Sequence, residues 1–317
     1  MPDDLGPTMR HDALMYDTPD SLLQATVPFL EDGLSAGEVV IVQVPEATWS
    51  LLGPALASPQ SIVRDPLADV HHHPHQSLWG LKQLVDEELR EGATAVRALA
   101  EVPPDTLQAG YLHWGRTESL LNTAMKDEHY WGLCSYSRKD LSPEVIDMAV
   151  STHPFLVNST SRKENARFES TRDYLRRVDS VRAIDPLEAA LPFATQQLLT
   201  MADLTSARGK LEAAFGLTTL SVQRKADLSD ALFEVAVNAM LYGKEPASVR
   251  IWLAADRMLC RVRDSGPGLS DPLAGYQPPD RRTSQAGSGL WSARQLCDVL
   301  TTTREPEGFT VRLSVAF

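Results

Sequence analysis

The sequence predicts two domains, an α/β domain in which helices flank a sheet, followed by an α+β domain. Three observations support this prediction. The 317 residues exceed the roughly 100 to 200 residues of one ordinary domain. In the first half, apolar runs alternate with helical stretches, which is the pattern of a sheet flanked by helices. Residues 1–220 carry a net charge of −13 and residues 221–317 carry +1, so the composition changes along the chain.

The first predicted element is a helix with a capped start. In TPDSLLQATVPFLEDGL, Thr18 is placed to cap the helix, Pro19 suits its first position, and glycines close its end. The apolar run EVVIVQV follows without alternation, as expected of a strand covered on both faces. Further strands at 94–99 and 131–136 alternate with helices that contain QSLWGLKQLVDEELR and RTESLLNTAMKDE.

A polar stretch joins the two halves. Residues 162–182 are rich in charged side chains and predict a connecting helix, and we expect helix to continue to about residue 216 with interruptions at Pro186 and Pro192. A long helix then runs from 221 to Gly243. After it we expect the strands SVRIWLA and MLCRVRD, a Gly/Pro loop, the helix GLWSARQLCDVL and the strand FTVRLSVAF.

Composition excludes several classes of protein. The acidic balance lacks the basic footprint of a nucleic-acid binder and does not favour adhesion to anionic membranes. No apolar run approaches the roughly 18 residues of a membrane helix. Three widely spaced cysteines exclude a disulfide scaffold and give no metal-ligand spacing, and each fits a buried side chain. We therefore expect a cytoplasmic protein with protein or small-molecule partners.

Polar residues of the second domain fall into three boxes. Glu234 and Asn238 lie four residues apart on the predicted helix, so both side chains leave the same face. Asp264 ends a predicted strand and runs into Ser-Gly-Pro-Gly, where glycines let the backbone approach a ligand closely. The third box, GSGL, opens the next helix, and amides at a helix N-terminus bind phosphate. The remaining residues of the boxes are Gly266, Gly268, Gly287, Gly289 and Leu290.

Alone, the first box, Glu234 and Asn238, also fits a solvated helix face. The glycine spacing is neither that of a Walker loop nor that of a Rossmann loop. The ordered series of boxes, however, resembles the ATP site of the Bergerat fold, the superfamily of gyrase, MutL and histidine kinases. The resemblance covers about 190–317 and implies helices on one face of a mixed sheet. It implies that Asp264 binds the adenine amino group and that Asn238 holds Mg²⁺ on the phosphates of ATP. In this family Gly266 and Gly268 shape the base pocket, 269–287 forms a lid, and Gly287 and Gly289 meet the phosphates.

The absence of later histidines selects a branch of this superfamily. A histidine kinase needs an acceptor histidine ahead of its ATP domain, whereas all eight histidines lie at or before His153. Glu234 can serve as a general base toward a hydroxyl group. The domain looks most like the anti-sigma-factor serine/threonine kinases, which implies a STAS-domain anti-anti-sigma partner, a sigma factor, or both. The family often carries histidine where Tyr242 stands, so a non-catalytic, nucleotide-gated binder is the alternative.

The front of the chain contains a second ordered series: His11-x-Ala-Leu-x-Tyr16, VVIVQVP, GRTESLLNTAM, Cys134-Ser-Tyr, LSPEVIDMA and Thr-His153-Pro. This series is similar to the MEDS sensory domain, a family linked to sensing small, hydrocarbon-like molecules. The resemblance implies a pocket for a small apolar ligand lined by His11, Tyr16, Cys134 and His153, although each can instead be a hydrogen-bonded framework residue.

These resemblances divide the chain into three parts. We expect a sensory domain at 1–157, a helical connector at 158–189 and an ATP-binding kinase domain at 190–317. Because the kinase family often dimerises, a homodimer is a further expectation.

A histidine cluster stands apart from both series. His71, His72, His73 and His75 lie beside Pro74 in a polar stretch, and their imidazoles are potential zinc or nickel ligands. A solvated loop ahead of the QSLWGLKQLV helix is the other interpretation.

Overall fold

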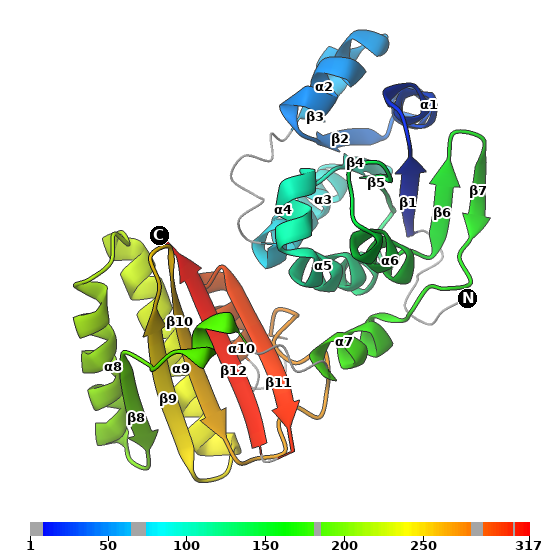
Figure 1. Ribbon diagram of the computed structural model, residues 1–317. Coiled ribbons are helices and arrows are strands. Elements are labelled where there is room, and N and C mark those ends of the chain that lie inside the picture. The colour runs from blue at the N-terminus through cyan, green and yellow to red at the C-terminus, as the bar shows by residue number, and fades with distance from the viewer. Residues whose placement is uncertain (1–8, 65–73, 181–184, 280–287, 307) are drawn as a thin grey trace. The chain divides into compact units, whose positions relative to one another are not determined.

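The chain forms two units in a computed structural model, Met1–Tyr174 and Leu175–Phe317, here called the N-terminal and C-terminal units. The structure describes residues 9–64, 74–180, 185–279, 288–306 and 308–317. Figure 1 shows that a sheet with packed helices forms the centre of each unit. None of the helices in these ranges combines the length and the apolar character that a bilayer crossing requires.

The N-terminal unit is built on a seven-stranded sheet with the order β3-β2-β4-β5-β1-β6-β7. Neighbouring strands run parallel, except that β7 is antiparallel to β6. The strands are β1 Arg10–Tyr16, β2 Val39–Gln43, β3 Val63–Arg64, β4 Val96–Ala100, β5 Tyr130–Ser137, β6 Phe155–Asn158 and β7 Ser161–Glu164. The helices are α1 Pro19–Ser35, α2 Glu46–Leu52, α3 Pro74–Arg90, α4 Pro104–Ala109, α5 Tyr111–Ala124 and α6 Pro143–Thr152, with 3-10 turns at Gly53–Ala55 and Pro59–Ser61.

Helices cover both faces of this sheet, with α1 and α2 on one side and α3, α5 and α6 on the other (Figure 1). Because side chains alternate along a strand, each strand contributes to both layers. On β5, Leu133 joins the apolar cluster under α1, whereas the next residue, Cys134, contacts Glu118 of α5. The unbroken apolar runs of the sequence are thus explained by strands that are buried on both faces.

The start of α1 confirms the predicted cap. Thr18 Oγ1 accepts a hydrogen bond from the Ser21 amide at 3.2 Å, and Ser21 Oγ accepts one from the Thr18 amide at 3.0 Å. Pro19 occupies the first position, where its missing N–H costs no hydrogen bond. This reciprocal cap satisfies amides that have no partner within the helix.

The C-terminal unit is an antiparallel sheet of five strands with the order β11-β12-β10-β9-β8. Its strands are β8 Ala194–Leu198, β9 Ala247–Leu253, β10 Arg257–Asp264, β11 Val299–Glu305 and β12 Gly308–Ala316. Its helices are α7 Thr171–Ser180, which begins in the N-terminal unit, α8 Met201–Phe215, α9 Val222–Tyr242 and α10 Ser288–Leu296, with a 3-10 turn at Pro186–Ala189. Side chains of α8, α9 and α10 form one apolar core with one face of the sheet.

The other face of this sheet is covered by the 3-10 turn and its flanks. Arg257 forms two 2.7 Å hydrogen bonds with Asp185, and both Arg261 and Arg312 form ion pairs with Glu188. The indole N–H of Trp252 donates to the Ala190 carbonyl at 3.0 Å. Arginines that would otherwise be buried without partners are therefore neutralised by a short acidic segment.

Three sequence-based expectations differ from the structure. The connecting region is only partly helical, because 161–164 form β7 and extend the first sheet, while α7 covers only 171–180. The helix expected to continue to 216 is interrupted by strand β8, which pairs with β9 and leaves α8 as a separate helix. The helix GLWSARQLCDVL ends at Leu296, since Val299 and Leu300 already pair with β12 as part of β11.

We expect Glu188→Gln to lower the free energy of unfolding of the C-terminal unit by about 3 kcal/mol at neutral pH, because breaking a buried ion pair leaves its partners unpaired. Burial alone would raise the pKa of Glu188, but Arg312 and Arg261 outweigh it and lower the pKa. The carboxylate therefore contributes its full stabilisation above the ordinary glutamate pKa of 4.5. This contribution is lost as the pH falls through the lower native pKa.

Urea unfolding followed by circular dichroism at pH 7 and below 4 tests this prediction. Wild type and Glu188→Gln should differ at pH 7 and converge in acid. The control, Glu212→Gln, removes one side of an exposed pair with Arg208 and should cost under about 0.5 kcal/mol. Equal midpoints for wild type and Glu188→Gln at neutral pH would contradict the role of the pair.

Candidate functional site

One candidate site lies where α9 and α10 meet. Glu234 and Asn238 project from the same face of α9, one turn apart. A Cβ atom placed on Gly289 would collide with the Glu234 carboxylate and would fall 3.2 Å from Asn238 Nδ2. The start of α10 can therefore approach these two side chains only because residue 289 is glycine.

Asp264 ends β10 beside this junction and is 6% exposed. Its Oδ1 accepts a 2.6 Å hydrogen bond from the Gly266 amide and lies 3.4 Å from the Lys244 amide. Among the described residues, Oδ2 makes no hydrogen bond. One carboxylate oxygen is thus fixed by the turn, and the other remains available to a ligand.

A cavity of about 440 Å³ connects these features. Its wall includes Asn238, Asp264, Gly268 and Leu290, together with apolar side chains such as Phe309. The volume lies within the range of small-molecule and cofactor pockets, and the lining combines apolar surface with a few polar groups. Glu234 and Gly289 do not line the cavity but neighbour Asn238, which does.

The loop after β10 depends on glycines with positive φ. Gly268 has a φ of +71°, and a Cβ atom there would collide with the ring of Phe309. Gly275 has a φ of +75°, and a Cβ there would collide with Leu290. Both glycines line the cavity. Because neither has a side chain, the loop can pack closely against Phe309 and Leu290.

The expected lid, 269–287, is described in its first half. Leu269, Ser270, Ala274 and Gly275 line the cavity, whereas 280–287, including the predicted phosphate-binding Gly287, lie outside the described residues. Tyr242 is 71% exposed and also lines the cavity.

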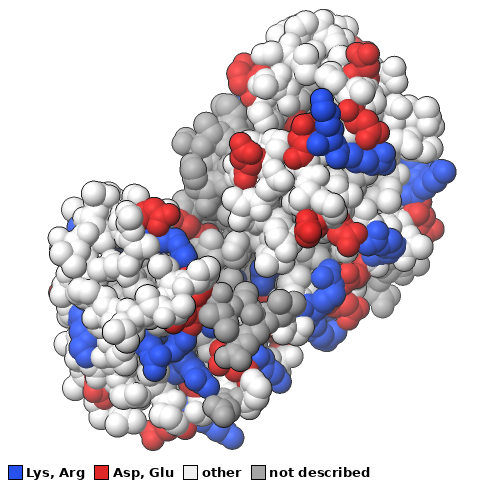
Figure 2. All heavy atoms as spheres, in the orientation of Figure 1, with Lys and Arg blue, Asp and Glu red and all other residues white. Residues whose placement is uncertain are grey.

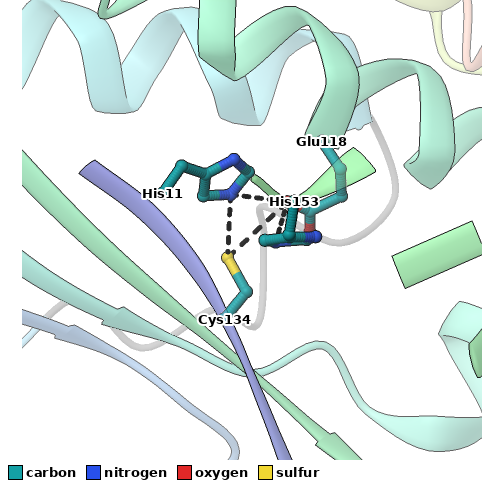
Figure 3. A group of neighbouring side chains, drawn as sticks. All are labelled: His11, Glu118, Cys134 and His153. Carbon is teal, nitrogen blue, oxygen red and sulfur yellow. Dashed lines mark hydrogen bonds and ion pairs between the residues drawn. The ribbon is translucent and has the colours of Figure 1, made fainter. Parts of the chain in front are cut away.

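A second candidate site lies inside the N-terminal unit. His11 of β1, Glu118 of α5, Cys134 of β5 and His153, directly after α6, point toward one another (Figure 3). Their ligating atoms all lie within 4.8 Å of one another, and all four residues are buried. Burial and the charge of Glu118 raise the pKa of the Cys134 thiol well above its usual range. Burial lowers the pKa of His153 to about 3, so its imidazole is neutral.

Tyr16 does not belong to this cluster. Its hydroxyl donates a 2.9 Å hydrogen bond to Glu101 Oε1, at the other end of β1. Burial, followed by the charge of Glu101, raises the pKa of Tyr16. Four residues were expected to line a ligand pocket. The structure brings three of them together, His11, Cys134 and His153, and separates Tyr16 from them.

A small cavity of about 60 Å³ borders the cluster. Glu118 and Cys134 line it, together with apolar side chains such as Leu78, Leu121 and Trp114. This volume suits a ligand of few atoms, since a cavity of about 10 to 15 Å³ on the same measure holds one water molecule.

Sequence reasoning missed Glu118, which is central to the second site. The signal was present, because RTESLLN places Glu118 and Asn122 four residues apart on a helix whose surroundings are apolar. A carboxylate and an amide on the same buried helix face need hydrogen-bond partners inside the protein, so this pattern predicts a polar cluster there. The histidine cluster contributes only His75 to the described residues, and His71, His72 and His73 lie outside them.

Comparisons with known proteins match the two units separately. Residues 10–154 match the family model described as MEDS, MEthanogen/methylotroph, DcmR Sensory domain. Residues 199–315 match the family model described as histidine kinase-like ATPase domain. No curated protein matches the chain.

Two solved structures resemble parts of the chain. The RsbU and RsbW domains of Rv1364c from Mycobacterium tuberculosis are 18% identical, with a TM-score of 0.29, over 38% of this chain and 32% of that one. The histidine kinase domain of the E. coli osmosensor EnvZ is 19% identical, with a TM-score of 0.24, over 40% of this chain and 90% of that one. The match thus spans about a third of the first structure's own length.

Each family match lies within one unit: the first covers β1 to β5 of the N-terminal sheet, and the second covers β9 to β11 and nearly all of β12 in the C-terminal sheet. The chain is therefore a signalling regulator that joins an N-terminal MEDS sensory domain to a C-terminal histidine kinase-like ATPase domain, the domain class that binds ATP.

Proposed function

We propose that the C-terminal domain is an anti-sigma-factor-type serine/threonine kinase that phosphorylates a STAS-domain anti-anti-sigma partner, and that the same domain binds a sigma factor. The convergence of Glu234, Asn238 and the N-terminus of α10 beside the cavity that contains Asp264 supports this proposal most directly. The cytoplasm supplies both the ATP and the partners, and a homodimer is the form we propose for the active protein.

The cavity fits a nucleotide in size and chemistry. The free Oδ2 of Asp264 can accept a hydrogen bond from the amino group of adenine, which guanine lacks at that position. Gly268 lets the ring of Phe309 pack closely against the loop in the cavity wall. Gly289 brings the N-terminus of α10, whose amides can bind phosphate, against Glu234 and Asn238. Asn238 offers its amide oxygen to a Mg²⁺ ion, which when bound would neutralise charge on the phosphates.

The proposed reaction needs a base near the phosphates. The hydroxyl oxygen of the partner's serine or threonine forms a bond to the γ-phosphorus of ATP, the bond from that phosphorus to the β,γ-bridging oxygen breaks, and ADP leaves. Glu234 takes the hydroxyl proton as general base. Because its carboxylate lies against Gly289 at the start of α10, it is close to where the phosphates would bind.

Tyr242 supports a second candidate function, that of a non-catalytic binder gated by nucleotide. Its exposed side chain is part of the cavity wall at the end of α9. A residue at this position that cannot support transfer would leave ATP bound and unreacted, and capture of the partner protein would be the output.

We further propose that the N-terminal domain controls this output by binding a small apolar molecule. The 60 Å³ cavity beside Glu118 and Cys134 limits the ligand to a few heavy atoms unless side chains move. Thr171, the first residue of α7 in the expected connector, donates a 2.7 Å hydrogen bond to the Ser119 carbonyl, so α7 is joined to α5 one residue from Glu118.

The first functional prediction concerns Asp264. Asp264→Asn should weaken ATP binding about tenfold or more, because a charge-assisted hydrogen bond contributes about 1.5 to 3 kcal/mol. Isothermal titration calorimetry with ATP and Mg²⁺ measures the change. The control is Asp256→Asn, an exposed carboxylate in the β9–β10 turn, which should bind ATP as wild type does. Equal affinities for wild type and Asp264→Asn would contradict the assignment.

The second functional prediction concerns Glu234. Glu234→Gln preserves the shape beside Gly289 and should keep ATP affinity within a few-fold, while phosphorylation of a STAS partner falls at least about a hundredfold through loss of the general base. Transfer of radiolabel from ATP to the purified partner measures the rate. If the variant loses ATP affinity instead, Glu234 is a binding residue and the base assignment is wrong.

The third functional prediction concerns Tyr242. If the protein is the non-catalytic binder, wild type should bind ATP and partner without transferring phosphate, and Tyr242→His should restore measurable transfer. If wild type is a kinase, Tyr242→His should change its rate by less than about tenfold, since positioning and charge stabilisation supply most of phosphoryl-transfer catalysis. The same radiolabel assay distinguishes the two outcomes, because transfer by wild type excludes the binder.

A further inference from the structure

Four buried side chains of the N-terminal unit have the donor set and spacing of a metal centre. The distances between Glu118 Oε2 and the other three donors are 3.3 Å to His11 Nε2, 3.5 Å to His153 Nε2 and 3.6 Å to Cys134 Sγ. Cys134 Sγ lies 3.5 Å from His11 Nε2. Metal bonds of about 2.0 to 2.3 Å in a tetrahedron separate the donors by about 3.3 to 3.6 Å. Four of the six donor–donor distances thus match these edges, and the other two are at most 4.8 Å.

The outer hydrogen bonds orient both imidazoles toward the centre. His153 Nδ1 lies 2.8 Å from the Ala149 carbonyl, which can only accept, so Nδ1 carries the hydrogen. Asn122 donates its Nδ2 to the Thr152 carbonyl at 2.9 Å, which turns its oxygen toward His11 Nδ1 at 3.1 Å. Both Nε2 atoms therefore point into the cluster. Such outer partners fix the tautomer and orientation of metal-binding histidines.

The centre also contains an unused ligand atom. His153 Nε2 is buried without a hydrogen-bond partner, while Nδ1 of the same ring faces the Ala149 carbonyl. Within the described ranges, the ion-pair partners of Glu118 are the two histidines. A divalent cation bound to one carboxylate and one thiolate gives a neutral centre, so its binding leaves no net charge buried there.

We propose that His11, Glu118, Cys134 and His153 form a tetrahedral site for one divalent transition-metal ion, and the donor set identifies this ion as zinc. Imidazole and thiolate ligands suit zinc, whereas magnesium and calcium require oxygen ligands. The four residues come from β1, α5, β5 and the end of α6, so the ion links two sheet strands to the two helices that cover them (Figure 3). Four protein ligands leave no open position, which is the arrangement of a structural centre.

The test uses the full-length protein without an affinity tag, with His71, His72 and His73 each replaced by glutamine so that this run cannot bind metal. Elemental analysis of the isolated protein should find about one zinc per chain. X-ray absorption at the zinc edge should show one sulfur and three nitrogen or oxygen ligands. Both measurements need no variant at the site itself. A protein without bound metal that also fails to bind added zinc, or a zinc shell without sulfur, would overturn the proposal.

Cobalt replacement then assigns the ligands. After removal of zinc, one equivalent of Co²⁺ should give the intense visible absorption of a tetrahedral centre and a near-ultraviolet thiolate charge-transfer band. Cys134→Ala should abolish this band, and Glu118→Gln should weaken metal binding at least about a hundredfold, since loss of an outer hydrogen-bond partner alone costs about 10- to 100-fold. Cys260→Ala, in the core of the other unit, is the matched control and should keep the band.

Folding of each variant is checked by circular dichroism and by ATP binding. If Cys134→Ala does not fold, Asn122→Leu, which removes only the outer partner of His11, should reduce cobalt affinity about 10- to 100-fold while the charge-transfer band persists at saturation. A band that survives in folded Cys134→Ala, or that disappears in Cys260→Ala, would refute the assigned ligands. None of these readouts depends on kinase activity, so failure of the metal site is distinguishable from failure of the proposed function.

Discussion

A polar side chain on a strand whose two faces are both covered by protein must find its partner inside the protein, because water cannot reach it. The N-terminal sheet shows how strongly this requirement shapes the unit. Asp12 faces one layer, where Arg162 of β7 contacts it with two hydrogen bonds of 2.6 and 2.9 Å and Trp131 donates a third at 3.1 Å. His11, one residue earlier, faces the other layer and meets Asn122 and Glu118. These pairs link β7 and α5 to strand β1.

The C-terminal unit also pairs its buried polar side chains inside the protein. The position of its cavity depends on the register between β10 and β12. Its arginine-rich outer face is neutralised by Asp185 and Glu188, while its inner face packs on α8, α9 and α10. On that frame Asp264, at the end of β10, lies opposite Phe309 of β12. The carboxylate and the aromatic wall of the cavity are therefore set by one position in the antiparallel pairing. Figure 2 shows charged side chains of both signs interspersed on the visible surface, in contrast to this mainly apolar cavity.

The sequence predicted the elements with strong local signals and missed those defined by distant pairing. The cap at Thr18, the long helix that ends at Tyr242 and the double-covered strands were predictable from spacing and apolar pattern. Strand β8 was not, because ATQQL lacks an apolar alternation and is held by pairing with β9. At β11, Val299 and Leu300 continue the apolar pattern of α10, which disguised the strand. In the sites, the three boxes were visible as motifs, whereas Glu118 becomes meaningful only when four distant segments meet.

Complete burial of His11 and His153, which are both 0% exposed, also governs how fast the interior can exchange anything with its surroundings. A solute could reach their Nε2 atoms through the cavity that Glu118 and Cys134 line, or when a neighbouring helix separates locally from the sheet. Where such local opening is required, its free energy adds to the barrier, and exchange is slower than at a site on the protein surface.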